Sequence, residues 1–137
     1  MSGMEQLYGA IQHANSRQHV EQVVTTYVNS FKDHDLTARE ALFAEDAVFS
    51  DPANSPSFDG IANIRAFWQQ IKASPTKFDP EIHQIVVCGD SVLLDFTMRM
   101  RSEEGSQSLR VRDIFEFNEK GKIQTLTAFW DPNCLGQ

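Results

Sequence analysis

The chain has 137 residues, which suits one domain with a substantial core and is too short for two. Its net charge of −7 argues against nucleic acid or an anionic membrane surface as a partner, and its 41% hydrophobic and 23% charged residues are typical of a soluble globular protein. No run approaches the roughly 20 apolar residues that a bilayer-spanning helix needs. Two cysteines, Cys88 and Cys134, are too few for a disulfide scaffold or a metal site, and we recognise no secretory leader. We therefore expect a cytoplasmic protein with reduced thiols.

The first half of the chain has the hydrophobic periodicity of helices. Residues 1–16 are only weakly patterned, and we expect an N-terminal extension there, followed by a single domain over residues 17–137. Over residues 19–33 the apolar residues recur at the i, i+3, i+4 and i+7 positions. This spacing predicts a helix with one buried face.

The next segments are shorter. Asp35 is a candidate N-cap for a second helix that ends near Ala44. A short strand is expected over residues 47–52, and a third helix over residues 59–73, where apolar residues again form a stripe.

The second half of the chain changes to the alternating period of strands. Four such segments are separated by turn signals, and they cover residues 81–89, 91–101, 108–118 and 122–132. Three helices followed by antiparallel strands predict an α+β fold, with the helices packed on one face of a curved, mainly antiparallel sheet. Such a cone encloses an apolar pocket, which suits a small and largely hydrophobic ligand.

One strand places a carboxylic acid among apolar side chains. Asp113 alternates with arginines that point to the opposite face, so those cations are poorly placed to neutralise it. An isolated carboxylate in an apolar site costs so much solvation that it usually stays protonated. Asp113 is therefore either a buried acid bonded to a neighbour or a neutral acid held ready to donate a hydrogen bond. The apolar residues on its face are Leu109, Val111, Phe115 and Phe117.

Two further polar groups are candidates for the same site. Tyr27 lies in the apolar stripe of the first helix, where by itself a tyrosine is more often a core residue with a paired hydroxyl. Asp51 ends the first strand directly before Pro52, and by itself this pair is typical of a turn. Taken together, Asp51 as a base and Tyr27 and Asp113 as two donors aimed at one oxygen supply what proton abstraction next to a carbonyl requires.

Three stretches of the chain also resemble a known family, the bacterial ketosteroid isomerases (steroid Δ-isomerases) of the SnoaL-like and nuclear-transport-factor-like superfamily. The run "VVTTYVNSFKDHDLTAREALFAEDAVFSDPANSP" resembles the first third of these enzymes, and "RVRDIFEFNEKGKI" and "TAFWDPN" resemble their last two strands. The resemblance covers about residues 20–133 and implies the cone-shaped, cystatin-like fold, an isomerase without a cofactor, and a homodimer. In this family an apolar site keeps one aspartic acid neutral at pH 7.

The resemblance also implies roles for individual residues. Tyr27 and Asp113 match the oxyanion hole, and Asp51 matches the general base. Some family members have further tyrosines bonded to the oxyanion-hole tyrosine, but Phe43 and Trp68 stand at those positions here, so this network is shortened or missing. The implied substrate-binding residues are Phe67, Met98, Met100, Val111 and Trp130.

We therefore expect an isomerase that moves a double bond from the β,γ to the α,β position of a 3-ketosteroid or similar hydrophobic ketone, without metal or cofactor. Its expected partners are that ketone and a second copy of the chain. Two alternatives stay open: another enzyme on the same cone, such as a polyketide cyclase, dehydratase or epoxide hydrolase, or a non-catalytic binding or association domain. Limonene epoxide hydrolases carry an arginine two residues before the strand aspartate, whereas this chain has Val111, which counts against that enzyme.

Overall fold

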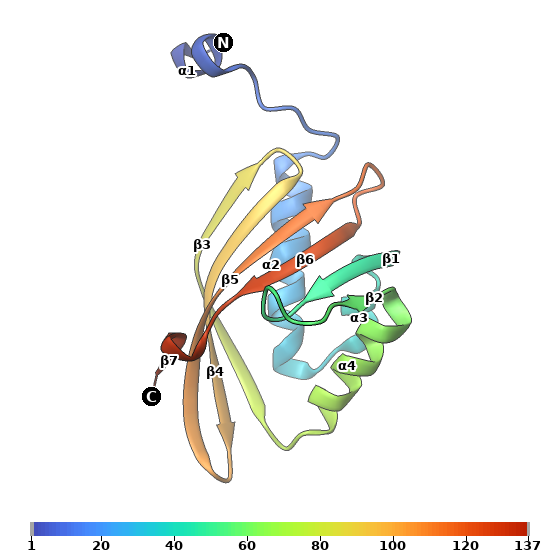
Figure 1. The fold of residues 1–137 in the computed structure, drawn as a ribbon, viewed down its shortest axis with the longest axis vertical. Coiled ribbons are helices and arrows are strands. Elements are labelled where there is room, and N and C mark those ends of the chain that lie inside the picture. Colours follow the sequence, from blue (N-terminus) through green and yellow to red (C-terminus); the bar gives the residue numbers. More distant parts are fainter. Residues whose placement is uncertain (1, 137) are drawn as a thin grey trace.

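A curved sheet of seven strands is the framework of the protein (Figure 1). The structure is a computed structural model, and it describes residues 2–136. The strands lie in the order β2-β1-β6-β5-β4-β3, with β7 paired to β5; β1 runs parallel to β6, and the other pairs are antiparallel. Their bounds are β1 Phe43–Ser50, β2 Phe58–Asp59, β3 Lys77–Cys88, β4 Ser91–Ser102, β5 Gly105–Phe117, β6 Ile123–Phe129 and β7 Leu135–Gly136.

The helices cover the concave side of this sheet, and the predicted α+β architecture is confirmed. α2 packs against β3 and β4, α4 packs against β1, and α3 joins α2 to α4. α1 stands apart from the rest of the protein, at the end of an extended segment (Figure 1). The bounds are α1 Gly3–Tyr8, α2 Arg17–Asp33, α3 Leu36–Glu40, α4 Ile61–Ala73 and the short 3-10 helix η1 Pro132–Cys134. Within residues 2–136, no helix has the length and apolar character needed to cross a membrane.

The predicted first helix is confirmed as α2, two residues longer at its start. The Ser16 hydroxyl caps it by accepting a hydrogen bond from the backbone N–H of His19. The helix ends at His34, whose left-handed backbone (φ 51°) stops the helical hydrogen bonds. Its apolar stripe is the buried face, and Val20, Val23, Val24, Tyr27 and Val28 belong to the core.

The predicted second helix is correct at its start and wrong at its end. The Asp35 side chain is the N-cap, as expected, but α3 ends at Glu40, and the chain enters β1 before Ala44. The cause is a long-range pairing, because the carbonyl of Leu42 accepts a hydrogen bond from Ile123 N–H (2.9 Å) where β1 joins β6. A helix of this length is marginal in isolation, so pairing with a distant strand prevails.

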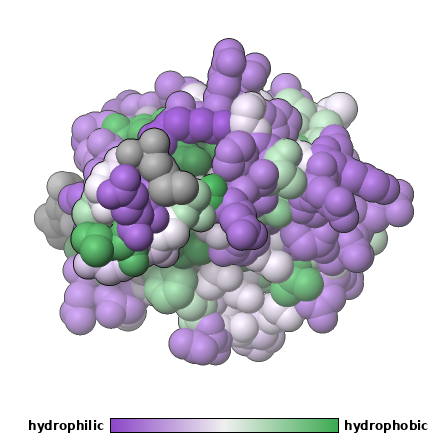
Figure 2. Space-filling view, turned by 90° about the horizontal axis from the view of Figure 1, so that it is seen from above, coloured by the Kyte–Doolittle hydropathy of each residue, from purple (hydrophilic) through white to green (hydrophobic). Residues whose placement is uncertain are grey.

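The concave face of the sheet is apolar along most of its length. On β4 and β5 the inward residues face one another in register, so that Leu94 pairs with Asp113 and Phe96 pairs with Val111. Burial alternates along β4 and along β5 from Leu109 to Phe117, which confirms the predicted faces. By contrast, the surface viewed from above is mostly hydrophilic, with hydrophobic side chains in small scattered patches (Figure 2).

Candidate active site

An apolar cavity of about 160 Å³ lies between α2 and the concave face of the sheet. It brings together the three residues that the sequence singled out for chemistry, and these are the ionisable side chains of its wall. The residues that line it are Tyr27, Phe31, Phe49, Asp51, Ile71, Phe78, Phe96, Met98, Met100, Leu109, Val111, Asp113, Ala128 and Trp130.

Asp113 is held in the middle of β5, with only 3% of its surface exposed. Leu94 lies beside it on β4 and Ala128 beside it on β6, so its neighbours across the sheet offer no charge. Arg110 and Arg112 point outward and form ion pairs with Asp95 on the other face. Burial, and secondly the nearby charge of Asp51, raise the pKa of Asp113 well above its usual value of 3.8. Both effects favour the neutral, hydrogen-bond-donating form of the carboxyl group.

Tyr27 reaches the cavity from α2 through a ring of aromatic side chains. Its ring lies edge-on to those of Phe31 and Phe115, with centroid separations of 5.4 and 5.5 Å. Burial raises the pKa of Tyr27 well above 10.0, the charges of Asp113 and Asp51 raise it further, and Arg39 offsets part of the rise. The causes of this shift are burial and charge, as they are for Asp113, so both side chains favour the protonated O–H form.

Behind Tyr27, aromatic rings occupy the place of the tyrosine network of some ketosteroid isomerases. Phe43 packs on Tyr27 with a centroid separation of 5.8 Å, and Trp68 packs on Phe43 at 5.1 Å. Arg39 is also buried there, with its guanidinium 3.7 Å from the centroid of Phe31. Sequence reasoning did not identify this arginine, because nothing in the short α3 segment distinguishes it from a surface cation.

A two-step hydrogen-bond chain links Arg39 to the helix that carries Tyr27. The Nε–H of Arg39 donates to the hydroxyl of Ser30 (2.8 Å), and that hydroxyl donates to the backbone carbonyl of Tyr27 (2.5 Å). Burial lowers the pKa of Arg39, but not enough to remove a positive charge, since an arginine stays protonated in proteins. A cation therefore lies behind the candidate oxyanion hole.

Asp51 lies where β1 ends, just before the cis peptide bond to Pro52. The indole N–H of Trp130 donates to Asp51 Oδ1 at 2.6 Å. Burial raises the pKa of Asp51, and the hydrogen bond from Trp130 lowers it again in part. The following loop is tied to β6, because Ala53 N–H donates to the carbonyl of Ala128 (2.7 Å). Asp51 thus has one oxygen bound to the indole and a second one to accept a proton.

The expectation that Phe67 lines the cavity is wrong. The buried face of α4 carries Ile64 and Trp68, and Phe67 lies to one side of it, stacked on Phe58 with centroids 4.6 Å apart. It borders a separate surface hollow, and Ile71, one turn later on α4, reaches the cavity instead. The other four expected residues, Met98, Met100, Val111 and Trp130, do line the cavity.

Several lining residues were missed although the pattern contained a signal for them. Phe96 and Leu109 share faces with the predicted Met98 and Val111, so strand alternation alone places them inward. Phe31 lies four residues after Tyr27, on the same side of α2. Phe78 had no such signal, because its position depends on how β3 curves over α2.

Comparison with known proteins agrees with this fold. Residues 24–126 match the model of the SnoaL-like domain. Two solved structures are similar in fold. One is the epoxide hydrolase/cyclase-like enzyme SalBIII, which has a role in pyran ring formation in the polyether salinomycin; its TM-score is 0.78 at 20% identity, and the match covers 88% of this chain and 97% of that chain. The other is an LEH-like epoxide hydrolase from M. tuberculosis, with a TM-score of 0.75 at 18% identity, and the match covers 85% of this chain and 86% of that chain.

These neighbours are epoxide hydrolase- or cyclase-like enzymes rather than ketosteroid isomerases, and at such low identity the likeness concerns the fold. The sequence resemblance is therefore confirmed at the level of the superfamily. Since the family model spans well over half of its residues, the chain belongs to the family of SnoaL-like domains.

Proposed function

We propose that the protein is a cofactor-independent isomerase that shifts a double bond from the β,γ to the α,β position of a 3-ketosteroid or similar hydrophobic ketone. The observation that carries this proposal is the combination of groups in one apolar cavity. Asp51 has a free carboxylate oxygen, and Tyr27 and Asp113 present two O–H groups whose raised pKa values favour their protonated forms.

The proposed reaction transfers one proton twice. Asp51 takes a proton from the carbon between the carbonyl and the double bond, and the electron pair of that C–H bond moves towards the carbonyl oxygen to form a dienolate. Tyr27 and Asp113 donate hydrogen bonds to this oxygen as its charge develops, which is where such donors lower the barrier most. Asp51 then returns the proton two carbons further along, which gives the conjugated ketone.

Epoxide opening is the second candidate, and the structural neighbours favour it. In that reaction the neutral Asp113 would protonate the epoxide oxygen while Asp51 activates a water molecule. The described residues that line the cavity include no lysine, arginine or histidine, and Val111 occupies the position of the arginine in limonene epoxide hydrolases. A site with two O–H donors and one carboxylate fits a developing enolate better.

The test is isomerisation of a β,γ-unsaturated 3-ketosteroid, followed by the ultraviolet absorbance of the conjugated product. We expect turnover by the wild type, a loss of at least about 10²–10⁴-fold in Asp51→Ala, and a loss of about 10²–10³-fold in Tyr27→Phe. Tyr8→Phe and Asp33→Ala are the matched controls, because both residues are exposed and neither lines the cavity.

The outcomes separate the candidates. Turnover that survives Asp51→Ala would contradict the isomerase mechanism. Hydrolysis of an epoxide with no isomerisation of the ketone would favour the second candidate. Binding of the steroid with no turnover above that of Asp51→Ala would favour a binding role.

A further inference from the structure

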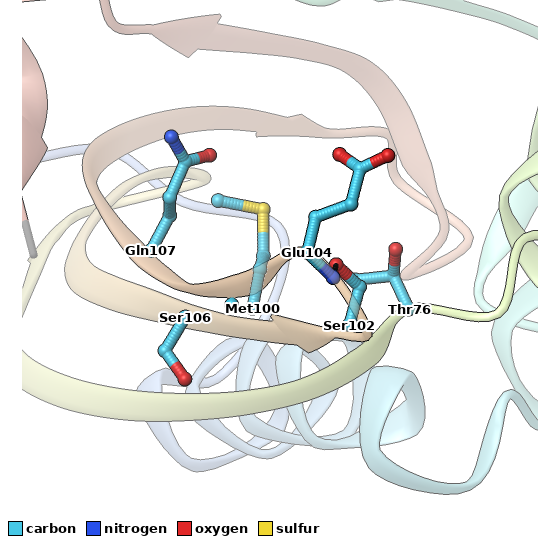
Figure 3. A pocket seen from close by; sticks show the side chains of 7 residues that line it. Thr76, Met100, Ser102, Glu104, Ser106 and Gln107 are labelled. Atoms are coloured by element: carbon cyan, nitrogen blue, oxygen red, sulfur yellow. Dashed lines mark hydrogen bonds between the residues drawn. The ribbon is translucent and has the colours of Figure 1, made fainter.

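A second hollow, of about 470 Å³, lies at the far end of the β4–β5 hairpin, next to the apolar cavity (Figure 3). Met100 lines both spaces, so the two adjoin at this side chain. Unlike the cavity, the second hollow is mostly polar. Its lining residues are Thr76, Met100, Ser102, Glu104, Gly105, Ser106 and Gln107, and we call it the hairpin hollow.

The hairpin hollow continues the inward face on which Asp113 lies. Beyond Met100 the next inward residue of β4 is Ser102, and beyond Leu109 the next inward residue of β5 is Gln107, which pairs with Met100. Gln107 and Met100 rise on the same side of the hairpin, whereas Ser106 points the other way (Figure 3). One continuous face therefore changes from apolar to polar along its length.

The distance from Asp113 in the apolar cavity to Gln107 in the hairpin hollow sets the length of a ligand that could contact both. Asp113 and Gln107 are six residues apart on β5, which is up to about 20 Å at about 3.3 Å per residue. A four-ring steroid nucleus has about half this length when C–C bonds of about 1.5 Å are summed. The apolar cavity alone, at about 160 Å³, is also smaller than the roughly 300–1,000 Å³ of ordinary ligand sites. A ligand that reaches from Asp113 to Gln107 must therefore be longer than a steroid nucleus, and the small volume of the cavity favours a ligand that extends beyond it.

The side chains of the hairpin hollow define the chemistry of its far end. Thr76, Ser102 and Gln107 offer neutral donors and acceptors, and Glu104 is the one charged residue of the lining. Arg101 lies next to Ser102 but alternates to the opposite face of β4. A ligand carboxylate would meet Glu104 without a compensating cation, whereas a hydroxyl or amide group would find partners.

We propose that the hairpin hollow binds the neutral, hydroxyl-bearing end of an elongated ketone whose carbonyl lies between Tyr27 and Asp113. This rests on the proposed function and narrows its substrate class to ketones with a long apolar body and a polar, uncharged tail. A 3-ketosteroid with a hydroxylated side chain on its last ring has that shape. Gln107 and Ser102 are the specificity-determining residues of this subsite.

The experiment compares two ligands that differ only at the far end, cholest-4-en-3-one and its 26-hydroxy derivative, by equilibrium binding at equal carrier concentration. We expect the wild type to bind the hydroxylated ketone about 3- to 10-fold more tightly, the usual effect of one net hydrogen bond. Gln107→Leu combined with Ser102→Ala should abolish this preference. Ser108→Ala, on the opposite face of the same strand, should retain it.

A third ligand with a carboxylate at the far end tests the charge argument, because Glu104→Gln should improve its binding relative to the hydroxylated ketone. Gln107 is exposed, so its substitution should leave folding intact, which the thermal unfolding midpoint verifies. Equal affinity for the first two ligands, or a preference that survives the double substitution, would overturn the subsite. Both ligands are already conjugated, so a hydroxyl preference without isomerase activity would support the subsite and contradict the proposed reaction alone.

Discussion

At the residue scale, the burial of Asp113 should be measurable as a pH dependence of stability. The unfolded chain releases this proton near the usual pKa of 3.8, whereas the folded protein retains it to much higher pH. Between these two values the folded state binds more protons than the unfolded state. The free energy of unfolding therefore falls as pH rises, by up to about 1.4 kcal/mol per pH unit for this one group.

Asp113→Asn removes the titrating proton and keeps a donor. Urea unfolding of wild type and Asp113→Asn between pH 4 and pH 8 should show the wild type losing stability relative to the variant as pH increases. Other carboxyl groups cancel in this comparison, because both proteins contain them. A difference that stays constant over the range would mean that Asp113 ionises as it does in the unfolded chain.

The hydrogen bond from Trp130 to Asp51 leads to a second prediction at the residue scale. Burial raises the pKa of Asp51, and the indole N–H lowers it, so the loss of that donor should raise the pKa further. In Trp130→Phe we expect the acid limb of the kcat/KM profile to move to higher pH, since the base must be ionised to accept a proton. Trp68→Phe is the control, because this tryptophan has no bond to Asp51, and its acid limb should not move.

Sequence reasoning located Asp113 and Tyr27 because each lies on a regular element whose period is visible. Asp113 interrupts an alternating strand, and Tyr27 interrupts a helical stripe. Two partners were not identified from the pattern: Trp130 as a donor to Asp51, and Arg39 behind Tyr27. These two contacts depend on loops and a short helix whose conformation is set by tertiary packing. The hydrophobic periodicity of the sequence contains no information about such packing.

At the scale of elements, the long strands and α2 could be predicted, and the short elements could not. β4 and β5 pair with each other over almost their whole length, so each retains a clear alternation of buried residues. β2 and β7 have two residues each and exist only because β1 and β5 offer hydrogen-bonding edges. The parallel pairing of β1 with β6 was also missed, because it joins segments about 80 residues apart.

The N-terminal segment is attached to the domain mainly by Asp90, and the Asn15 side chain also donates to the carbonyl of Asn118 (2.9 Å). Asp90, in the β3–β4 turn, accepts hydrogen bonds from the backbone N–H groups of Ala14 (2.8 Å) and Asn15 (3.0 Å), and from the Asn15 side chain (2.9 Å). The neighbouring Gly89, at φ +66°, leaves room for the segment, because a Cβ atom there would lie 2.3 Å from the carbonyl oxygen of Gln12.

Asp90→Ala should therefore release this segment and leave the cavity intact. We expect the amide protons of Ala14 and Asn15 to exchange about 5- to 10-fold faster, which corresponds to about 1 kcal/mol of lost hydrogen bonding. Hydrogen exchange followed by NMR measures this directly. Asp59→Ala, which removes a surface bond from Ser57 at the opposite edge of the sheet, should leave both rates unchanged. Unchanged rates in Asp90→Ala would show that other contacts hold the segment.

At the scale of the whole molecule, the site follows from the way in which the sheet curves over the helices. The positions that the family resemblance implied for Met98, Val111 and Trp130 agree with strand parity, because inward faces of a curved sheet converge on one space. The resemblance failed for Phe67, since the rotation of α4 about its axis is decided by its contacts with β1 and β2. Curvature and helix rotation are properties of the assembled fold, which explains why the hairpin hollow was not predicted.

The family resemblance implies that the protein is a homodimer, and this prediction concerns the whole molecule. Phe129 is 52% exposed on the outer face of the sheet, next to Arg112 of β5, and Val86 and Leu135 are also exposed on strands of this sheet. Large apolar side chains exposed on a sheet are typical of a surface that a partner covers. We expect a second copy to cover it, so that sedimentation velocity at micromolar concentration gives the mass of a dimer.

Phe129→Asp should shift that equilibrium towards the monomer, because it replaces a large apolar side chain with a carboxylate that is costly to bury. The residue is exposed in the single chain, so the substitution should change stability little in the monomer itself. Leu7→Asp, which adds the same charge at an exposed apolar residue of α1, should leave the dimer intact. Dissociation by Leu7→Asp alone would place the interface at the N-terminal segment, and a monomeric wild type would contradict the homodimer altogether.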